Sequence, residues 1–203
     1  NLEICMIAPV IPVLIINEID NVRSLGEALV AGGLPVLEVT LRTNCALKAI
    51  ELITNKVPNA IVGAGTLRTK SDATNAKLAG SQFAVSPGYT NEMGIICKEL
   101  ELPLLPGVST GGEVMHANND GYSFLKLFPA LAVGGISLLK GFSGPFPDIK
   151  FCPTGGVTVT SAADFLALPN VPVCGGTWLT PKNLIENKDW PAITKLAKQA
   201  SSI

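Results

Sequence analysis

Short apolar runs alternate with amphipathic segments from one end of the chain to the other. The apolar runs have the length of buried strands and are rich in Val, Ile, Leu and Phe. The pattern predicts eight strands, over residues 10–16, 36–41, 60–64, 83–86, 102–105, 123–127, 149–152 and 171–174. Between them, helical spacing of apolar residues predicts helices over 20–31, 44–55, 71–79, 91–99 and 134–140, and 190–200 closes the chain.

Repeated strand–helix units predict parallel strands. No linker, charge block or low-complexity stretch interrupts the 203 residues, so we expect a single domain over residues 1–203. Eight such units in this length predict an α/β fold, a small (β/α)8 TIM barrel. A doubly wound open sheet is the alternative. Glycines favour the barrel because they follow several strand ends, whereas an open sheet would concentrate them at one switch point; they lie at 63, 65, 88, 107, 155, 156, 175 and 176.

The composition supports a compact core and argues against charged partners. Hydrophobic residues make up 47% and charged residues 15%, and 15 Lys and Arg balance 16 Asp and Glu. This near balance argues against nucleic acid or an anionic membrane as the main partner. The longest apolar stretch, residues 7–16, is too short to span a bilayer and contains Pro9 and Pro12, so we interpret it as a buried strand.

Cysteine and histidine content limits the metal and redox chemistry. The five cysteines are scattered and form no CxxC pair, which argues against a disulfide framework or a zinc knuckle. Such cysteine usage fits a reducing cytoplasm, where we expect the protein to act. The single histidine, His116, argues against zinc and iron sites that need two histidines. We therefore expect no metal site.

Alternation along residues 36–42 separates polar from apolar side chains. Glu38, Thr40 and Arg42 share one face of the predicted strand, and the apolar residues 37, 39 and 41 share the other. Since the apolar face packs under helices, the polar face points into the barrel, where ionised groups are costly unless paired or used. Two interpretations follow: a functional site, or a buried Glu38–Arg42 ion pair that closes the barrel.

The same test places Phe124, Lys126 and Phe128 on one inward face. Burial disfavours the ammonium form and so favours the free amine that a nucleophile needs. The alternative is a lysine whose charged end reaches out to the barrel rim. Lys150 is a competing candidate, but it lies near the start of its strand, and barrel chemistry gathers at the carboxyl ends of the strands. We therefore favour Lys126.

Two further motifs point to phosphate binding and to a helix start. The last two predicted strands end in Gly155–Gly156 and Gly175–Gly176, and paired glycines expose backbone N–H groups to an anion. Each pair alone is weak evidence, because tight turns use glycine for backbone reasons.

Residues 107–111 match the GxSxG motif of esterases, but no Ser–acid–His order can be assembled with His116. We interpret this segment as a helix start capped by Thr110 and Glu113.

Five segments together resemble one known family, the class I 2-keto-3-deoxy-6-phosphogluconate (KDPG)/4-hydroxy-2-oxoglutarate (KHG) aldolases. In order and spacing they look like its motifs, at residues 37–43, 63–66, 86–88, 126–130 and 153–156. The resemblance implies that Lys126 forms a Schiff base and that Glu38 shuttles protons. It also implies substrate-carboxylate contacts from Arg42 and Thr66, a pocket shaped by Thr154, Pro87 and Phe128, and a phosphate site at Gly155, Gly156, Gly175, Gly176 and Thr177.

The sequence departs from the family pattern at two positions. Leu127 stands where Phe is frequent, but its parity turns it away from the pocket. Thr177 stands where Ser is more usual, which keeps the hydroxyl and adds a methyl group.

The reaction that the resemblance implies is a reversible aldol cleavage, which gives pyruvate and glyceraldehyde 3-phosphate, or glyoxylate from the shorter substrate. The chemistry needs no metal and no organic cofactor. The resemblance further implies a homotrimer whose partners are small 2-oxo acids and phosphorylated aldehydes, with a place in the Entner–Doudoroff pathway of carbohydrate metabolism. The alternatives are a phosphate-binding barrel isomerase or decarboxylase that uses Lys126 and Glu38 as acid and base, and a non-catalytic phosphate-binding barrel.

Overall fold

The computed structural model describes residues 2–203. A 3-10 helix, η1 (Leu2–Met6), precedes a regular alternation of strands and helices. In the described chain the strands are nine in number: β1 (Val10–Leu14), β2 (Val36–Thr40), β3 (Ile61–Gly65), β4 (Phe83–Val85), β5 (Leu104–Leu105), β6 (Gly107–Val108), β7 (Phe124–Leu127), β8 (Lys150–Pro153) and β9 (Cys174–Gly176).

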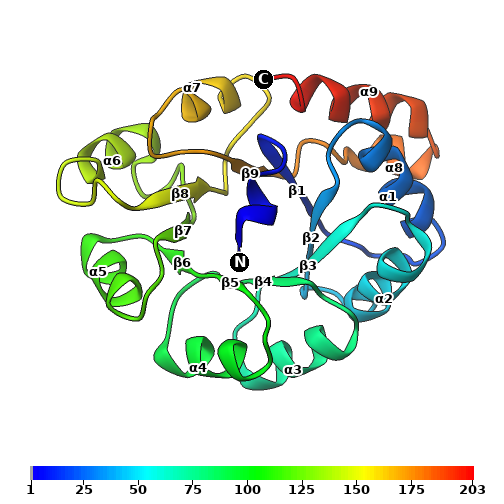
Figure 1. The fold of residues 1–203 in the computed structure, drawn as a ribbon. Coiled ribbons are helices and arrows are strands. Elements are labelled where there is room, and N and C mark those ends of the chain that lie inside the picture. Colours follow the sequence, from blue (N-terminus) through cyan, green and yellow to red (C-terminus); the bar gives the residue numbers. More distant parts are fainter. Residues whose placement is uncertain (1) are drawn as a thin grey trace.

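The helices lie outside the strands (Figure 1). They are α1 (Val22–Ala31), α2 (Ala46–Lys56), α3 (Lys70–Leu78), α4 (Asn91–Glu99), α5 (Gly111–Asn119), α6 (Gly135–Phe142), α7 (Ala162–Leu166), α8 (Lys182–Glu186) and α9 (Trp190–Ala200). The predicted capping box is confirmed: Thr110 accepts from the amide of Glu113, whose side chain accepts from the amide of Thr110. Helices α7 and α8 were not predicted, because each spans only five residues. No helix of residues 2–203 is long and apolar enough to cross a membrane.

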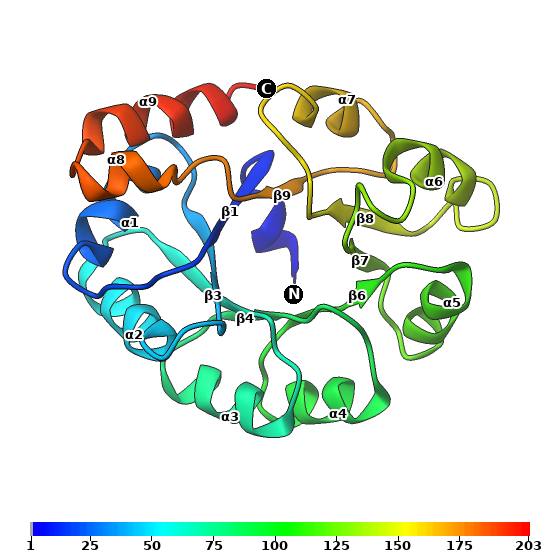
Figure 2. The same cartoon turned by 180° about the vertical axis from the view of Figure 1, so that it is seen from behind.

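The predicted closed eight-stranded barrel is wrong in its hydrogen bonding. The strands form two parallel sheets, a six-stranded sheet in the order β5-β4-β3-β2-β1-β9 and a three-stranded sheet in the order β6-β7-β8. Both sheets curl around a common interior, with the helices as an outer layer (Figures 1 and 2). Within residues 2–203 the strand order does not reverse as it would in the doubly wound alternative.

The ladder is interrupted at two places, each with a local cause. The fifth predicted strand continues past Leu105, but Pro106 has no N–H to donate and divides it. Its first part, β5, pairs with β4, and its second part, β6, pairs with β7. On the opposite side, the described residues form no ladder between β8 and β9, and an isolated bridge links Thr154 to Gly175. Because of these two breaks, the strands form two curled sheets and not one closed barrel.

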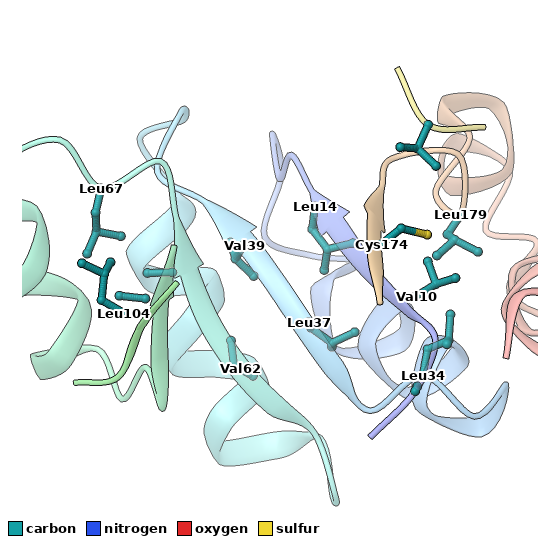
Figure 3. Close-up of a cluster of buried hydrophobic side chains, with 14 of the residues drawn as sticks. Val10, Leu14, Leu34, Leu37, Val39, Val62, Leu67, Leu104, Cys174 and Leu179 are labelled. Carbon is teal, nitrogen blue, oxygen red and sulfur yellow. The ribbon is translucent and has the colours of Figure 1, made fainter. Parts of the chain in front are cut away.

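Side chains of the strands divide between an outer and an inner core, as alternation predicts. On β2, Leu37 and Val39 belong to the larger core cluster between strands and helices. Figure 3 shows both among apolar side chains of neighbouring strands. On β7, Leu125 and Leu127 pack into the same outer cluster. The opposite faces of β2 and β7 therefore point into the enclosed interior.

The amino ends of the strands are closed by a second, inner apolar cluster. It includes Val36, Phe83 and Phe124, which are the first residues of β2, β4 and β7. Helix η1 lies in the middle of the ring of strands (Figures 1 and 2) and contributes Cys5 to this cluster. On β4 and β5 this cluster extends to the last strand residues, Val85 and Leu105, whereas on β2 and β7 the next inward positions are the polar Glu38 and Lys126.

Candidate active site

Lys126 and Glu38 meet inside the molecule, near the carboxyl ends of β7 and β2. The Lys126 Nζ lies 3.1 Å from Glu38 Oε1 and 3.4 Å from Oε2. Both residues are almost fully buried, with 4% and 3% of their surfaces exposed. The inward faces predicted for both strands are confirmed. Because Lys126 remains inside, the interpretation as a rim lysine is wrong.

The buried pair has compensation for its desolvation. A charged group in a low-dielectric interior is costly unless an opposite charge and further polar contacts are present. The Lys126 Nζ donates to the carboxylate and also lies 5.2 Å from the centre of the Phe128 ring, within range of a cation–π contact. An amine and a carboxylate in direct contact, away from water, can exchange a proton without a solvent intermediary.

Arg42 is not the ion-pair partner of Glu38. Its Nε donates to Thr66 Oγ1 at 3.1 Å, and its side chain lies exposed beyond the end of β2. Thr66 has φ of +65°, in the left-handed region that β-branched residues rarely adopt. Since β2 and β3 are parallel neighbours, the two residues stand together at the carboxyl ends. The interpretation of Glu38 and Arg42 as a barrel-closing pair is therefore wrong.

The competing lysine lies away from this site. Lys150 is the first residue of β8, is exposed, and donates from Nζ to the carbonyl of Pro169 at 3.0 Å. It thus caps a loop at the amino ends of the strands, opposite to Lys126.

The two glycine pairs lie side by side, but only Gly155–Gly156 forms a bend after its strand, whereas Gly175–Gly176 belongs to β9 itself. The bridge between Thr154 and Gly175 joins the end of β8 to β9. Gly155 and Gly156 have φ of +96° and +84°, which glycine adopts without strain. Gly176 lies directly under the ring of Trp178, where a Cβ atom would clash. The predicted phosphate segments are thus neighbours in space, although they are far apart in sequence.

The remaining predicted pocket residues follow the carboxyl ends of other strands. Pro87 is half-buried after β4, and Gly107 packs against its backbone so closely that a Cβ at Gly107 would clash. Thr154 is buried, and its Oγ1 lies 3.9 Å from Cys152 Sγ. Phe128 is half-buried beside Lys126.

Cys152 is a neighbour of the site that the sequence did not single out. It stands directly opposite Lys126 in the β7–β8 register and is buried. Burial raises the pKa of its thiol to about 12, and the neighbouring Lys126 only partly counteracts this. Such a thiol is a poor nucleophile at neutral pH. Within residues 2–203, no group of three or more His, Cys, Asp and Glu residues is placed to hold a metal ion.

A cavity of about 320 Å³ opens beside the end of β9. Thr177 lies at its edge, and Val22, Leu25 and Ile185 give it an apolar wall between α1 and α8. It is therefore next to the predicted phosphate turns but does not include Lys126 or Glu38.

Comparison with known proteins links this geometry to one family. The family model described as KDPG and KHG aldolase matches residues 2–196. A 2-dehydro-3-deoxy-phosphogluconate aldolase of Pseudoalteromonas atlantica is 46% identical over 192 residues, which cover 95% of this chain and 89% of the relative. A KHG/KDPG aldolase of Escherichia coli is 45% identical over 192 residues, which cover 95% and 90%.

Solved structures agree with the sequence comparisons. The KDPG aldolase of Legionella pneumophila, solved with pyruvate captured as a covalent carbinolamine intermediate, has a TM-score of 0.94 at 46% identity, over 97% of this chain and 95% of the other. The enzyme of Zymomonas mobilis with 3-phosphoglycerate has a TM-score of 0.95 at 44% identity, over 100% and 95%. The chain therefore belongs to the KDPG and KHG aldolase family.

Proposed function

We propose that this protein is a class I aldolase that reversibly cleaves 2-dehydro-3-deoxy-6-phosphogluconate to pyruvate and glyceraldehyde 3-phosphate. The observation that carries the proposal is the buried contact between Lys126 and Glu38, 3.1 Å long. It joins an amine nucleophile to a base within hydrogen-bond reach. The relative that is named a KHG/KDPG aldolase supports 4-hydroxy-2-oxoglutarate as a second substrate, cleaved to pyruvate and glyoxylate.

Glu38 first accepts a proton from the Lys126 ammonium, and the free amine attacks the C2 ketone of the substrate. The carbinolamine that forms loses its hydroxyl as water, with the proton returned by Glu38, and leaves an iminium ion. Glu38 then accepts the proton of the C4 hydroxyl. The electrons of the C3–C4 bond pass to the iminium, so that an aldehyde leaves and a pyruvate enamine remains. Protonation at C3 and hydrolysis release pyruvate and Lys126.

Arg42 and Thr66 bind the substrate carboxylate in this proposal. A guanidinium can hold a carboxylate through two parallel hydrogen bonds, and the hydroxyl of Thr66 already stands 3.1 Å from Arg42 Nε. Thr154, Pro87 and Phe128 shape the pocket around the reacting carbons. Phe128 supports this role because its ring lies 5.2 Å from the Lys126 Nζ.

The phosphate group binds at the two adjacent glycine pairs, which follow β8 and end β9. Gly155, Gly156, Gly175 and Gly176 offer backbone N–H groups, and Thr177 adds a hydroxyl. No Lys or Arg occurs between Thr154 and Thr180, so backbone donors must supply most of the binding. The Zymomonas mobilis enzyme holds 3-phosphoglycerate, a phosphorylated three-carbon compound, which supports a ligand of this class.

The protein acts as a homotrimer in the cytoplasm. The resemblance to the aldolase family and the scattered, unpaired cysteines support this part of the proposal. Light scattering coupled to size-exclusion chromatography tests the oligomeric state, and a mass of one chain contradicts the trimer.

Reductive trapping tests the proposed chemistry. With pyruvate and borohydride we expect irreversible loss of activity and one reduced pyruvyl group on the peptide that contains Lys126. Lys150→Arg is the matched control and keeps full trapping, because Lys150 lies at the opposite end of the strands. A label on Lys150 contradicts the assignment of Lys126. Absence of any label, together with isomerase or decarboxylase turnover, favours the alternative use of Lys126 and Glu38 as acid and base.

A further inference from the structure

The inner face of β3 is almost empty of side chains. The positions that alternate inward are Ile61, Gly63 and Gly65, and only Ile61 packs against the inner apolar cluster. Glycine weakens a strand, because it gives up more backbone freedom and has no side chain to pack. Two glycines on one face of a central strand therefore need a reason in the surroundings.

Space rather than backbone conformation explains the glycine at 65. Its φ lies outside the left-handed region that favours glycine. A Cβ atom at this position would overlap Glu38 Oε1 and would lie 2.7 Å from Glu38 Cγ and 2.8 Å from Cδ. The Glu38 side chain thus occupies the volume that any other residue at position 65 would fill.

The backbone around Gly65 cannot easily move to relieve such a clash. Strand β3 pairs with β2 over its full length, from Val36 opposite Ile61 to Thr40 opposite Gly65. The Gly65 carbonyl accepts from the amide of Leu41 at 2.8 Å. The next residue, Thr66, is held with a left-handed φ and accepts a hydrogen bond from Arg42. With the strand fixed on both sides, the side chain of Glu38 must yield.

We propose that Gly65 is a positioning residue that lets the Glu38 carboxylate lie across β3 and reach Lys126 Nζ. A methyl group at position 65 displaces the carboxylate from its 3.1 Å contact and so slows every proton transfer assigned to it. The inference rests on the proposed function, in which Glu38 moves protons for the Schiff-base chemistry. It adds a residue that touches neither substrate nor lysine.

Gly63 provides an internal comparison on the same strand. A Cβ there would meet the ring of Phe83 instead of Glu38. Phe83 is fully buried in the inner apolar cluster, and Gly63 stands opposite Glu38 in the β2–β3 register. The two glycines therefore distinguish packing against the Phe83 ring from positioning of the Glu38 carboxylate.

The test compares Gly65→Ala with Gly112→Ala, a helical, exposed position where a Cβ meets nothing within 4 Å. We expect Gly65→Ala to lower kcat by about tenfold or more with little change in KM. Proton transfer by Glu38 is impaired, while the contacts of Arg42 and Thr66 with the substrate carboxylate remain. Gly112→Ala keeps wild-type kcat and KM. In a Glu38→Gln background, Gly65→Ala costs less than about threefold further, since the group it positions is already gone.

Three results overturn the inference: wild-type kcat in Gly65→Ala, a fall in kcat equal to that in Gly112→Ala, or full additivity with Glu38→Gln. If Gly65→Ala does not fold, the variant Glu38→Ala/Gly65→Ala decides, because it removes the clashing side chain. Recovery of the fold supports the contact, and continued failure overturns it. Pyruvate trapping in the wild type separates the two proposals: without trapping the proposed function fails, whereas trapping with unaffected Gly65→Ala turnover defeats only this inference.

Discussion

The two ends of the enclosed interior are built by the same faces of the same strands, yet their chemistry is opposite. At the amino end, Val36 of β2 and Phe124 of β7 belong to an apolar cluster. Two residues further along each strand, Glu38 and Lys126 form a buried ion pair. All four residues are buried. Alternation therefore decides which side chains enter the interior, and position along the strand decides what they do there.

What closes each end explains the difference. Helix η1 brings Cys5 against the amino end, where it packs with the apolar residues of the inner cluster. At the carboxyl end, Gly65 leaves room for the Glu38 carboxylate, and the glycines that follow β8 and end β9 carry no side chains. The amino end is thus dominated by apolar packing, and the carboxyl end by the buried ion pair and the glycines around it. Variants in each region test this division.

Lys126→Arg should have the largest effect. Arginine keeps a cation beside Glu38, but it stays protonated and cannot attack a ketone. We expect a loss of turnover of about 10⁴-fold or more and no reductive trapping of pyruvate, with the far-ultraviolet circular dichroism spectrum unchanged. Lys150→Arg, at the amino end of β8, is the control and retains activity. Reductive trapping of pyruvate in Lys126→Arg at the wild-type level would show that another residue is the nucleophile.

Phe83→Ala should break the apolar end without abolishing chemistry. Phe83 is fully buried, and removal of a buried aromatic side chain costs about 3–5 kcal/mol of the free energy of unfolding. Urea denaturation measures this loss. Turnover per active site, counted by pyruvate trapping, should remain close to that of the wild type. A selective fall in turnover without loss of stability would show that the two ends are not separate.

Glu38→Gln is the corresponding change at the polar end. The amide keeps the size of the side chain and can still accept from Lys126, but it cannot take up a proton. We expect turnover to fall by about 10²-fold while the fold stays intact, although the free energy of unfolding also falls because the buried Lys126 loses its opposite charge. Stopped-flow measurement of the chemical step checks this. Near-normal turnover would show that the Lys126–Glu38 contact is structural and that Glu38 does not transfer protons.

Much of this division could be predicted from the sequence, because strand alternation is a local property. The inward placement of Glu38 and Lys126 could be predicted because the residues directly before and after each of them are apolar and face the helices. Their mutual contact did not, since the two residues are 88 positions apart and only the curl of the sheets joins them. The space at Gly65 was equally hidden, because it depends on a side chain of another strand.

The closure of the barrel was mispredicted for a related reason. The number of predicted strands does not show which neighbouring strands form hydrogen bonds. Pro106 divides the fifth predicted strand, and an isolated Thr154–Gly175 bridge stands where a ladder between β8 and β9 would close the barrel. The short helices α7 and α8 lack enough turns for a periodic signal. In contrast, the start of α5 was predictable because the capping box of Thr110 and Glu113 is a local motif.

Thr177→Val should have the smallest effect. It tests whether the proposed binding site extends from Lys126 and Glu38 as far as the residue after β9. Valine keeps the shape of the side chain but removes the hydroxyl proposed to bind phosphate. Loss of one such hydrogen bond corresponds to about 1 kcal/mol, or roughly a fivefold fall in kcat/KM. The fall should occur for the phosphorylated six-carbon substrate and not for its unphosphorylated analogue, which serves as the internal control. Equal effects on the two substrates would place the phosphate away from Thr177, and would restrict the functional part of the interior to the region around Lys126 and Glu38.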